Sequence, residues 1–195
     1  MARFLPARIR SVGDMSTDAP LYERDPAAYQ AYLAEGNRTQ PRKRVGADVI
    51  FRDGEGRILL VNPRYKPDWD LPGGMAEANE PPIDAARREV LEELGLDWRG
   101  GRLLAVDWVP PHGPWDDSLM FIFDGGVLSG GDIARIALAD GELDSHEFCE
   151  LGAARDRLRP YVLRRVHGAL AALREGGTAY LHGGGVDQRT GQEQA

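Results

Sequence analysis

Residues 71–96 read LPGGMAEANEPPIDAARREVLEELGL. The prolines at its centre and Gly95 near its end predict a helix over 82–94 that is entered through two glycines. Glu89, Glu92 and Glu93 stand at i, i+3 and i+4, so a helix gathers their carboxylates in one narrow arc. Like charges at this spacing cost roughly 0.2–0.5 kcal/mol per pair, so something must offset their repulsion.

A solvated helix face is the ordinary explanation for such acids, but three features oppose it. The nearby bases, Arg87 and Arg88, both precede the acids and do not alternate with them. Acids in the last turn oppose the helix dipole, and the preceding glycines let backbone carbonyls approach the site. Mg²⁺ prefers oxygen ligands and keeps waters for substrate phosphates, so the pattern predicts a magnesium site.

These residues also resemble a known family. Gly74, Glu80 and the run REVLEELGL at 88–96 match every defined position of the signature box of the Nudix hydrolases. The resemblance extends over about 44–172. It implies an α/β fold, an α/β/α sandwich around a mixed β-sheet, in which water cleaves a diphosphate linkage with Mg²⁺ or Mn²⁺.

The resemblance also implies roles for individual residues. Glu89, Glu92 and Glu93 become metal ligands, and one of them is a candidate base for the attacking water. The carbonyl of Gly73 becomes a backbone ligand. Arg88 would hold the acids in register through charge-assisted hydrogen bonds.

Other positions of the box and its surroundings have open roles. Glu80 would either support the loop or bind a second ion through water. The resemblance also implies a further acid after the sheet, five residues before a Glu that is followed by an aromatic. GELDSHEF, residues 141–148, fits this pattern, so Glu142 is the candidate for a further ligand or base, with an exposed loop acid as the alternative. Asn79 replaces the usual glycine and can adopt a left-handed conformation. Pro81 replaces a capping hydroxyl, so we expect a weaker start to the helix.

A nucleotide substrate needs an aromatic platform and cations. The candidates for stacking are Tyr65, Trp69 and Trp115, and those for phosphate binding are Arg44, Arg64 and Lys66. Trp108 alternates with Val106 in an expected strand, which indicates core packing. Pro111, sixteen positions beyond Gly95, resembles the branch of the family that cleaves ADP-ribose.

The rest of the chain predicts further strands and helices. Strand-like runs lie at 44–51, 57–63, 101–111, 117–126, 132–138, 145–151 and 178–181, the last as an edge strand. Two C-terminal helices are expected on either side of Pro160, the second ending at Gly176. We therefore expect a Nudix domain over 41–182 and a disordered tail over 183–195.

Residues 1–40 contain one expected helix, capped by Asp25 and ended by Gly36. Such a helix is too short to be stable alone in water. The expected apolar stripe, Tyr29, Tyr32 and Leu33, must pack on something, so we expect this extension to shape the substrate cleft or a homodimer contact. A disordered leader is the alternative.

Composition limits the class of partner. The chain has 195 residues, is 42% hydrophobic and carries a net charge of −7, which opposes nucleic acid as the main partner. No run is long and apolar enough to cross a membrane, and the N-terminus lacks the apolar core of a secretory signal.

The lone cysteine, Cys149, predicts an inert buried thiol in the cytoplasm. Met1 and Met15 are both candidate starts.

Four functions remain open. The first is a Mg²⁺-dependent hydrolase of a nucleoside diphosphate linked to another moiety, such as ADP-ribose or a nucleotide sugar. The second is a nucleoside triphosphate pyrophosphohydrolase. An isoprenoid diphosphate isomerase on the same fold would want a catalytic cysteine, which Cys149 in a late strand does not obviously supply. A nucleotide-sensing module without turnover would have no need of a complete acidic box.

Overall fold

The computed structural model describes residues 19–138 and 141–186, and the chain divides into two compact units, Met1–Arg42 and Lys43–Ala195. In the first unit, the described part forms α1 (Leu21–Arg24) and α2 (Pro26–Thr39), and neither helix buries a residue. The Asp25 carboxylate caps α2 by accepting from Ala28 N at 2.9 Å, as expected. The predicted role of this segment in a cleft or a dimer stays a prediction.

The predicted end of α2 at Gly36 is wrong. Gly36 does not take the left-handed conformation that ends a helix, and the helix continues to Thr39. Local contacts stabilise the extra turn: Arg38 pairs with Glu35 at 2.7 Å, and Thr39 Oγ1 donates to the Glu35 carbonyl at 2.9 Å.

The second unit is built on a mixed sheet with the strand order β6-β2-β1-β5-β4-β7-β8, and β3 pairs with β1. The β1–β5 and β4–β7 pairs are parallel, and the other pairs are antiparallel. The strands are β1 (Arg44–Arg52), β2 (Ile58–Pro63), β3 (Gly73–Met75), β4 (Leu103–Val109), β5 (Ser118–Val127), β6 (Leu143–Cys149), β7 (Ala179–His182) and β8 (Gly185–Val186).

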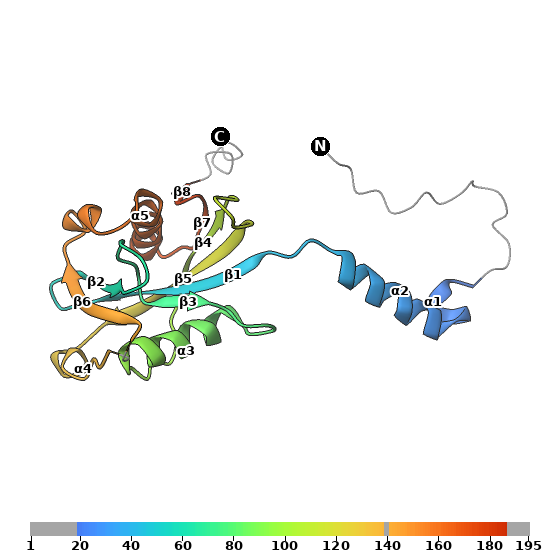
Figure 1. Ribbon diagram of the computed structural model, residues 1–195, viewed down its shortest axis with the longest axis horizontal. Coiled ribbons are helices and arrows are strands. Elements are labelled where there is room, and N and C mark those ends of the chain that lie inside the picture. The colour runs from blue at the N-terminus through green and yellow to red at the C-terminus, as the bar shows by residue number, and fades with distance from the viewer. Residues whose placement is uncertain (1–18, 139–140, 187–195) are drawn as a thin grey trace. The chain divides into compact units, whose positions relative to one another are not determined.

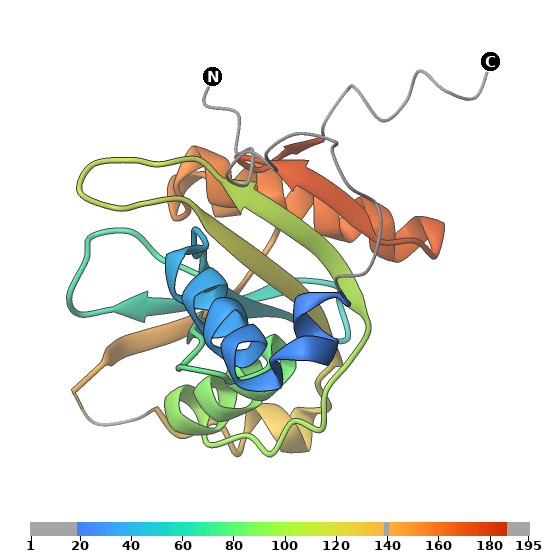
Figure 2. The same ribbon diagram turned by 90° about the vertical axis from the view of Figure 1, so that its right-hand side faces the viewer.

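Helices cover both faces of this sheet (Figure 1). On one face lies α3 (Pro82–Leu94), and on the other lies α5 (Pro160–Glu175) after a short 3₁₀ turn at Ala153–Asp156. Figure 2 shows the green α3 and the orange α5 on opposite sides of the strands. The α/β/α sandwich is therefore confirmed.

Alternation of side chains along the strands produces two cores. On β1, Val49 and Phe51 pack in the cluster with α3, whereas Ile50 between them packs in the cluster with α5. On β2, Leu59 and Leu60 divide in the same way. Both faces of each central strand are thus buried, which explains the continuous apolar runs in the sequence.

The ends of α3 match the expectation. The helix begins at Pro82 after Pro81, which makes no side-chain cap, and ends at Gly95 in a left-handed conformation. Asn79 also has a positive φ, of 64°, so the asparagine adopts the turn in place of glycine. Cys149 is buried as predicted, and burial raises the pKa of its thiol.

Three predictions about the later chain are corrected. Residues 132–138 form no strand: Ser129 and Asp132 make a capping box that begins the short α4 (Gly130–Ile133). The strand β7 is not an edge, because β8 pairs with it. The disordered tail does not begin at Gly183 as predicted, since residues 183–186 form a turn and β8, held by a hydrogen bond from Gly184 N to Asp107 Oδ1 at 3.0 Å. Residues 187–195 lie outside the described part.

Membrane-crossing helices are absent from the described residues, where no helix is both long and apolar enough.

Candidate active site

The acidic face of α3 meets the backbone of β3 at close range. Gly73 has a φ of 142°, and a Cβ there would lie 2.3 Å from the Ala47 carbonyl oxygen. A Cβ on Gly74 would lie 2.5 Å from the carboxyl carbon of Glu89. Position 73 therefore requires glycine, whereas a side chain at Gly74 would displace the Glu89 carboxylate, and the pair brings main-chain atoms next to the acids of the helix.

Glu93 is the buried member of the acid triad. It is 7% exposed, and its Oε2 accepts a hydrogen bond from Gly73 N at 2.9 Å. The pKa of its carboxyl group is raised to about 8, mainly by burial; the Gly73 hydrogen bond opposes this shift, and the charges of Glu89, Asp48 and Asp70 add to it. A carboxylate in these surroundings favours a nearby cation.

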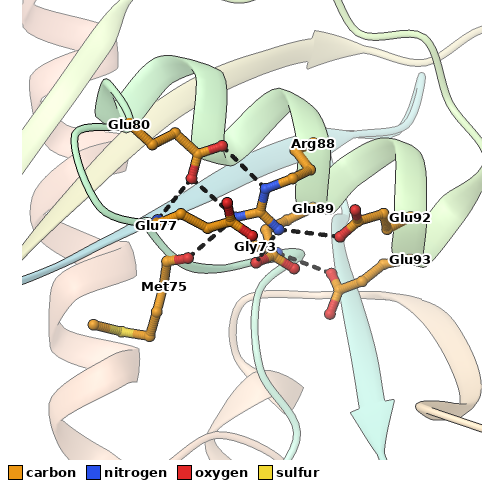
Figure 3. A network of polar contacts seen from close by, with 8 residues as sticks. All are labelled: Gly73, Met75, Glu77, Glu80, Arg88, Glu89, Glu92 and Glu93. Carbon is orange, nitrogen blue, oxygen red and sulfur yellow. Dashed lines mark hydrogen bonds and ion pairs between the residues drawn. The ribbon is translucent and has the colours of Figure 1, made fainter.

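Arg88 connects the other acids of the box (Figure 3). Its Nε and Nη2 donate to the two carboxylate oxygens of Glu80, each at 3.0 Å. Its Nη1 donates to Glu89 Oε1 at 2.9 Å and to Glu92 Oε2 at 3.1 Å. The Glu80 contact is the main reason why the pKa of Arg88 is raised and that of Glu80 lowered. Arg88 thus orients two acids and attaches the loop before α3.

Glu142 lies near the triad although it comes from the distant segment before β6. Burial raises the pKa of Glu89, the Arg88 contact opposes this shift, and the charges of Glu92 and Glu142 raise the pKa further. Glu142 is exposed, and its carbonyl oxygen accepts from Arg64 N at 3.0 Å. The structure therefore brings this sequence-predicted acid toward Glu89.

The donors suit a hard divalent cation. Within the described residues, no three His, Cys, Asp or Glu side chains form a ready metal-binding group, and Arg88 engages one oxygen each of Glu89 and Glu92. The atoms available are all oxygens, and Glu93 accepts one hydrogen bond in a buried setting. Such a donor set fits Mg²⁺ or Mn²⁺ and disfavours softer metals.

Two cavities adjoin the acids. One, of about 160 Å³, is lined by Gly73, Gly74, Glu93, Tyr65 and Lys66, among others. The second, of about 150 Å³, is lined by residues from the opposite side of the sheet and from the β4–β5 loop: Arg44, His112, Trp115, Ser118, Tyr161 and Arg165. Both cavities share the wall residues Asp48, Asp70, Met75 and Met120, so they adjoin each other, and we call the pair the cleft.

The predicted substrate residues divide between this cleft and other places. The guanidinium of Arg44 lies 4.3 Å from the ring centre of Trp115 in the second cavity, and Tyr65 and Lys66 line the first. Arg64 pairs with Asp144 at 2.5 Å and lines neither cavity.

Trp69 has a different setting. It packs against the core beneath α5, and the Arg157 guanidinium lies 5.0 Å from its ring centre. It lines neither of the two cavities.

Sequence reasoning missed Asp48, Asp70, Tyr161 and Arg165, which also line the cleft. Burial raises the pKa of Asp48 to about 7, with Asp70 adding to the shift and Arg165 opposing it. The signal was an acid inside the apolar run ADVIF and an arginine on the apolar face of α5. Larger hollows of about 390 and 580 Å³ lie beside the 97–99 loop, but of the acid network they contain Arg88 alone.

The family follows from a comparison with known proteins. The model of the NUDIX domain matches residues 42–167, which is more than half of the chain. The protein belongs to the Nudix family.

Curated relatives match over shorter segments. A 66-residue segment is 44% identical to diphosphoinositol polyphosphate phosphohydrolase 2 of Rattus norvegicus, covering 33% of this chain and 37% of that protein. A 96-residue segment is 38% identical to a putative 8-oxo-dGTP diphosphatase of Bacillus subtilis, covering 49% and 58%. The matches thus span less than two thirds of either relative.

Solved structures share the fold. A UDP-X diphosphatase superposes with a TM-score of 0.60 at 18% identity, covering 80% of this chain and 74% of that one. The NUDIX domain of Shewanella oneidensis NrtR in complex with ADP ribose gives a TM-score of 0.59 at 16% identity, covering 74% and 97%. At these identities the likeness concerns the fold alone.

Proposed function

We propose that this protein hydrolyses a diphosphate linkage in a nucleotide-like small molecule, with Mg²⁺ or Mn²⁺ as cofactor. The observation that carries the proposal is the buried Glu93 carboxylate, which lies beside Glu89 and the Gly73 backbone at the wall of a cleft. Membership of the Nudix family supports it, as do relatives whose names describe a phosphohydrolase and a diphosphatase.

The metal would be held by the carbonyl of Gly73 and by Glu89, Glu92 and Glu93, with Glu142 as a further ligand or base. When bound, such a cation neutralises diphosphate charge and lowers the pKa of bound water. The chain's own contribution is to position the reacting groups. Arg88 orients the carboxylates of Glu89 and Glu92, at 2.9 and 3.1 Å.

Proton transfer is assigned to a carboxylate of this face. Glu89, Glu92 and Glu93 are the candidates for the base, because each could take the proton of the attacking water once a cation keeps it ionised. The glycines keep side chains away from the space where the diphosphate would lie, because a Cβ at Gly74 would collide with Glu89. Lys66 and Arg44, on opposite parts of the cleft, would contact the substrate's ends.

We favour a diphosphate that carries an organic group on both sides, such as ADP-ribose or a nucleotide sugar, because two cavities adjoin at Asp48 and Asp70 and Glu93 lines one of them. A nucleoside triphosphate is the second candidate, supported by the Bacillus subtilis relative.

The test is turnover with Mg²⁺ over ADP-ribose, UDP-glucose, ATP and dGTP, for the wild type, Glu92→Gln and the control Glu175→Gln. Glu175 is an exposed acid at the end of α5. We expect turnover that Glu92→Gln lowers by orders of magnitude and that Glu175→Gln leaves unchanged. Tight binding without product from any of these compounds would instead identify a nucleotide sensor.

A further inference from the structure

The wall shared by the two cavities contains two carboxyl groups in different states. Asp70 is engaged: its Oδ2 accepts from Lys66 Nζ at 2.6 Å, and its Oδ1 accepts from Leu71 N at 3.1 Å. Asp48 is 5% exposed, and in the described part of the chain no group donates a hydrogen bond to its carboxylate. Arg165 Nη1 approaches Asp48 Oδ2 only to 3.6 Å. The fully buried side-chain atoms without a partner in the described residues belong to Arg52 and Arg159, so the Asp48 oxygens keep some access to the cavities that this residue lines.

Arg165 hydrogen-bonds to another acid and stays at ion-pair distance from Asp48. Its Nε donates to Asp107 Oδ2 at 2.8 Å, and this pair is buried on both sides. Asp107 Oδ1 accepts from Gly184 N, so the arginine is held on the side of β4, away from Asp48. Asp48 thus has Arg165 as an ion-pair neighbour, and its carboxylate oxygens can still accept a hydrogen bond from a ligand where the two cavities adjoin.

The charges that line the cleft are balanced without any ligand. The two cavities have three cationic residues, Arg44, Lys66 and Arg165, and three acidic residues, Asp48, Asp70 and Glu93. Two of these cations are already paired with acids, Lys66 with Asp70 and Arg165 with Asp107. A substrate with phosphates beyond those that a metal neutralises would bring negative charge next to Asp48.

We propose that Asp48 is a specificity-determining residue that accepts a hydrogen bond from a neutral donor of the substrate, a hydroxyl or an amino group, in the cavity beside Trp115 and Tyr161. The inference rests on the proposed function and deepens it. Asp48 selects a diphosphate whose second substituent is a polar organic group and disfavours a further phosphate at this position. Arg165 acts as a positioning residue, since it fixes the side of the carboxylate that stays open.

The experiment compares wild type, Asp48→Asn and the control Asp124→Asn. Asp124 is a partly buried strand aspartate that pairs with Arg52 at 2.7 Å and lines neither cavity. The probes are ADP-ribose, 2′-deoxy-ADP-ribose, IDP-ribose, UDP-glucose and ATP, with kcat and KM measured at saturating Mg²⁺. IDP-ribose lacks the base amino group and the deoxy compound lacks one hydroxyl, so these two arms distinguish the sources of the donor.

We expect the wild type to prefer ADP-ribose or UDP-glucose over ATP. Asp48→Asn should reduce that preference at least about tenfold, mainly through KM, because a hydrogen bond to a charged group contributes about 1.5–3 kcal/mol. The analogue that lacks the donor should lose affinity with wild type and should lose less with Asp48→Asn, whose amide oxygen accepts a hydrogen bond more weakly than a carboxylate does. Asp124→Asn should keep the wild-type preference.

Two results would overturn the inference while leaving the proposed function intact: a wild type that turns over ATP as well as ADP-ribose and UDP-glucose, or an Asp48→Asn that slows every substrate equally. If the wild type turns over none of the probes, the proposed function fails, and binding measured by calorimetry then tests the role of Asp48. Tighter binding of ADP-ribose than of ATP, lost in Asp48→Asn, would still support the inference, and equal binding would end it.

Discussion

Two buried acids on opposite faces of the sheet have different surroundings. Asp107 of β4 is fully buried and accepts hydrogen bonds from Arg165 Nε at 2.8 Å and from Gly184 N at 3.0 Å. Glu93 of α3 is also buried, but it accepts only from Gly73 N among the described residues, and its pKa is raised to about 8. Proteins pair the charges that they bury for structure, so the incompletely compensated acid indicates a site prepared for a ligand.

The largest expected effect separates the two acids by activity. Glu93→Gln should lower turnover by about 10²–10⁴-fold, the usual range for a group that acts on the reacting atoms. The same variant should melt at or above the wild-type temperature without metal, because burial disfavours the ionised carboxylate that it replaces. Near wild-type turnover at saturating Mg²⁺ would remove Glu93 from the site.

The second effect is the converse, a loss of stability at Asp107. Asp107→Asn leaves the buried Arg165 without its main partner, a change that costs about 3–5 kcal/mol in buried pairs. We expect about 3 kcal/mol, the lower end, because Asp48 remains 3.6 Å from Arg165. Chemical denaturation measures the free energy of unfolding. A loss no larger than that of the control Asp124→Asn would show that the Asp107 pair is not structural.

A third prediction compares how a metal ion changes the stability of the wild type and of the Glu93 and Asp107 variants. Mg²⁺ or Mn²⁺ should raise the melting temperature of the wild type, since a ligand at a hundred times its dissociation constant stabilises by about 2.7 kcal/mol. Asp107→Asn should keep this increment, and Glu93→Gln should lose most of it. Calcium should bind but support poor turnover because of its looser geometry. Melting curves indifferent to all three ions would contradict the metal site.

The smallest effect concerns a third acid, Asp53, in the β1–β2 turn. Desolvation tends to raise the pKa of Asp53, but hydrogen bonds from the Arg57 side chain and from the Arg57 and Glu55 amides outweigh it and lower the pKa. A lowered folded-state pKa means that this stability is present above the unfolded-state pKa and is lost as pH falls through the folded-state value.

Asp53→Asn should therefore flatten part of the acid limb of the stability curve, below about pH 4. The measurement is the urea midpoint as a function of pH for wild type and variant. An identical acid limb in both proteins would mean that the turn contacts do not contribute.

The local elements, and the grouping of acids on α3, could be predicted from the sequence alone. The spacing of Glu89, Glu92 and Glu93, the boundaries at Pro82 and Gly95, and the glycine turn are local properties, because a helix places residues by their separation along the chain. The same holds for most strands. The prediction from sequence was wrong where local hydrogen bonds competed with an apolar pattern. The capping box at Ser129, for example, begins a short helix in the region where a strand was expected at 132–138.

The residues that surround those acids could be identified only in the three-dimensional structure. Pairing of Asp48 with Gly73 across β1 and β3 brings a carboxyl group to the cleft, and α5 places Arg165 beside it from far along the chain. Such contacts depend on which strands pair and which helix face is buried, and the separations along the chain do not encode them. Charge compensation is a property of three-dimensional neighbours: Asp107 and Glu93 are both acids within apolar patterns, and their neighbours compensate the charge of Asp107 more completely than that of Glu93.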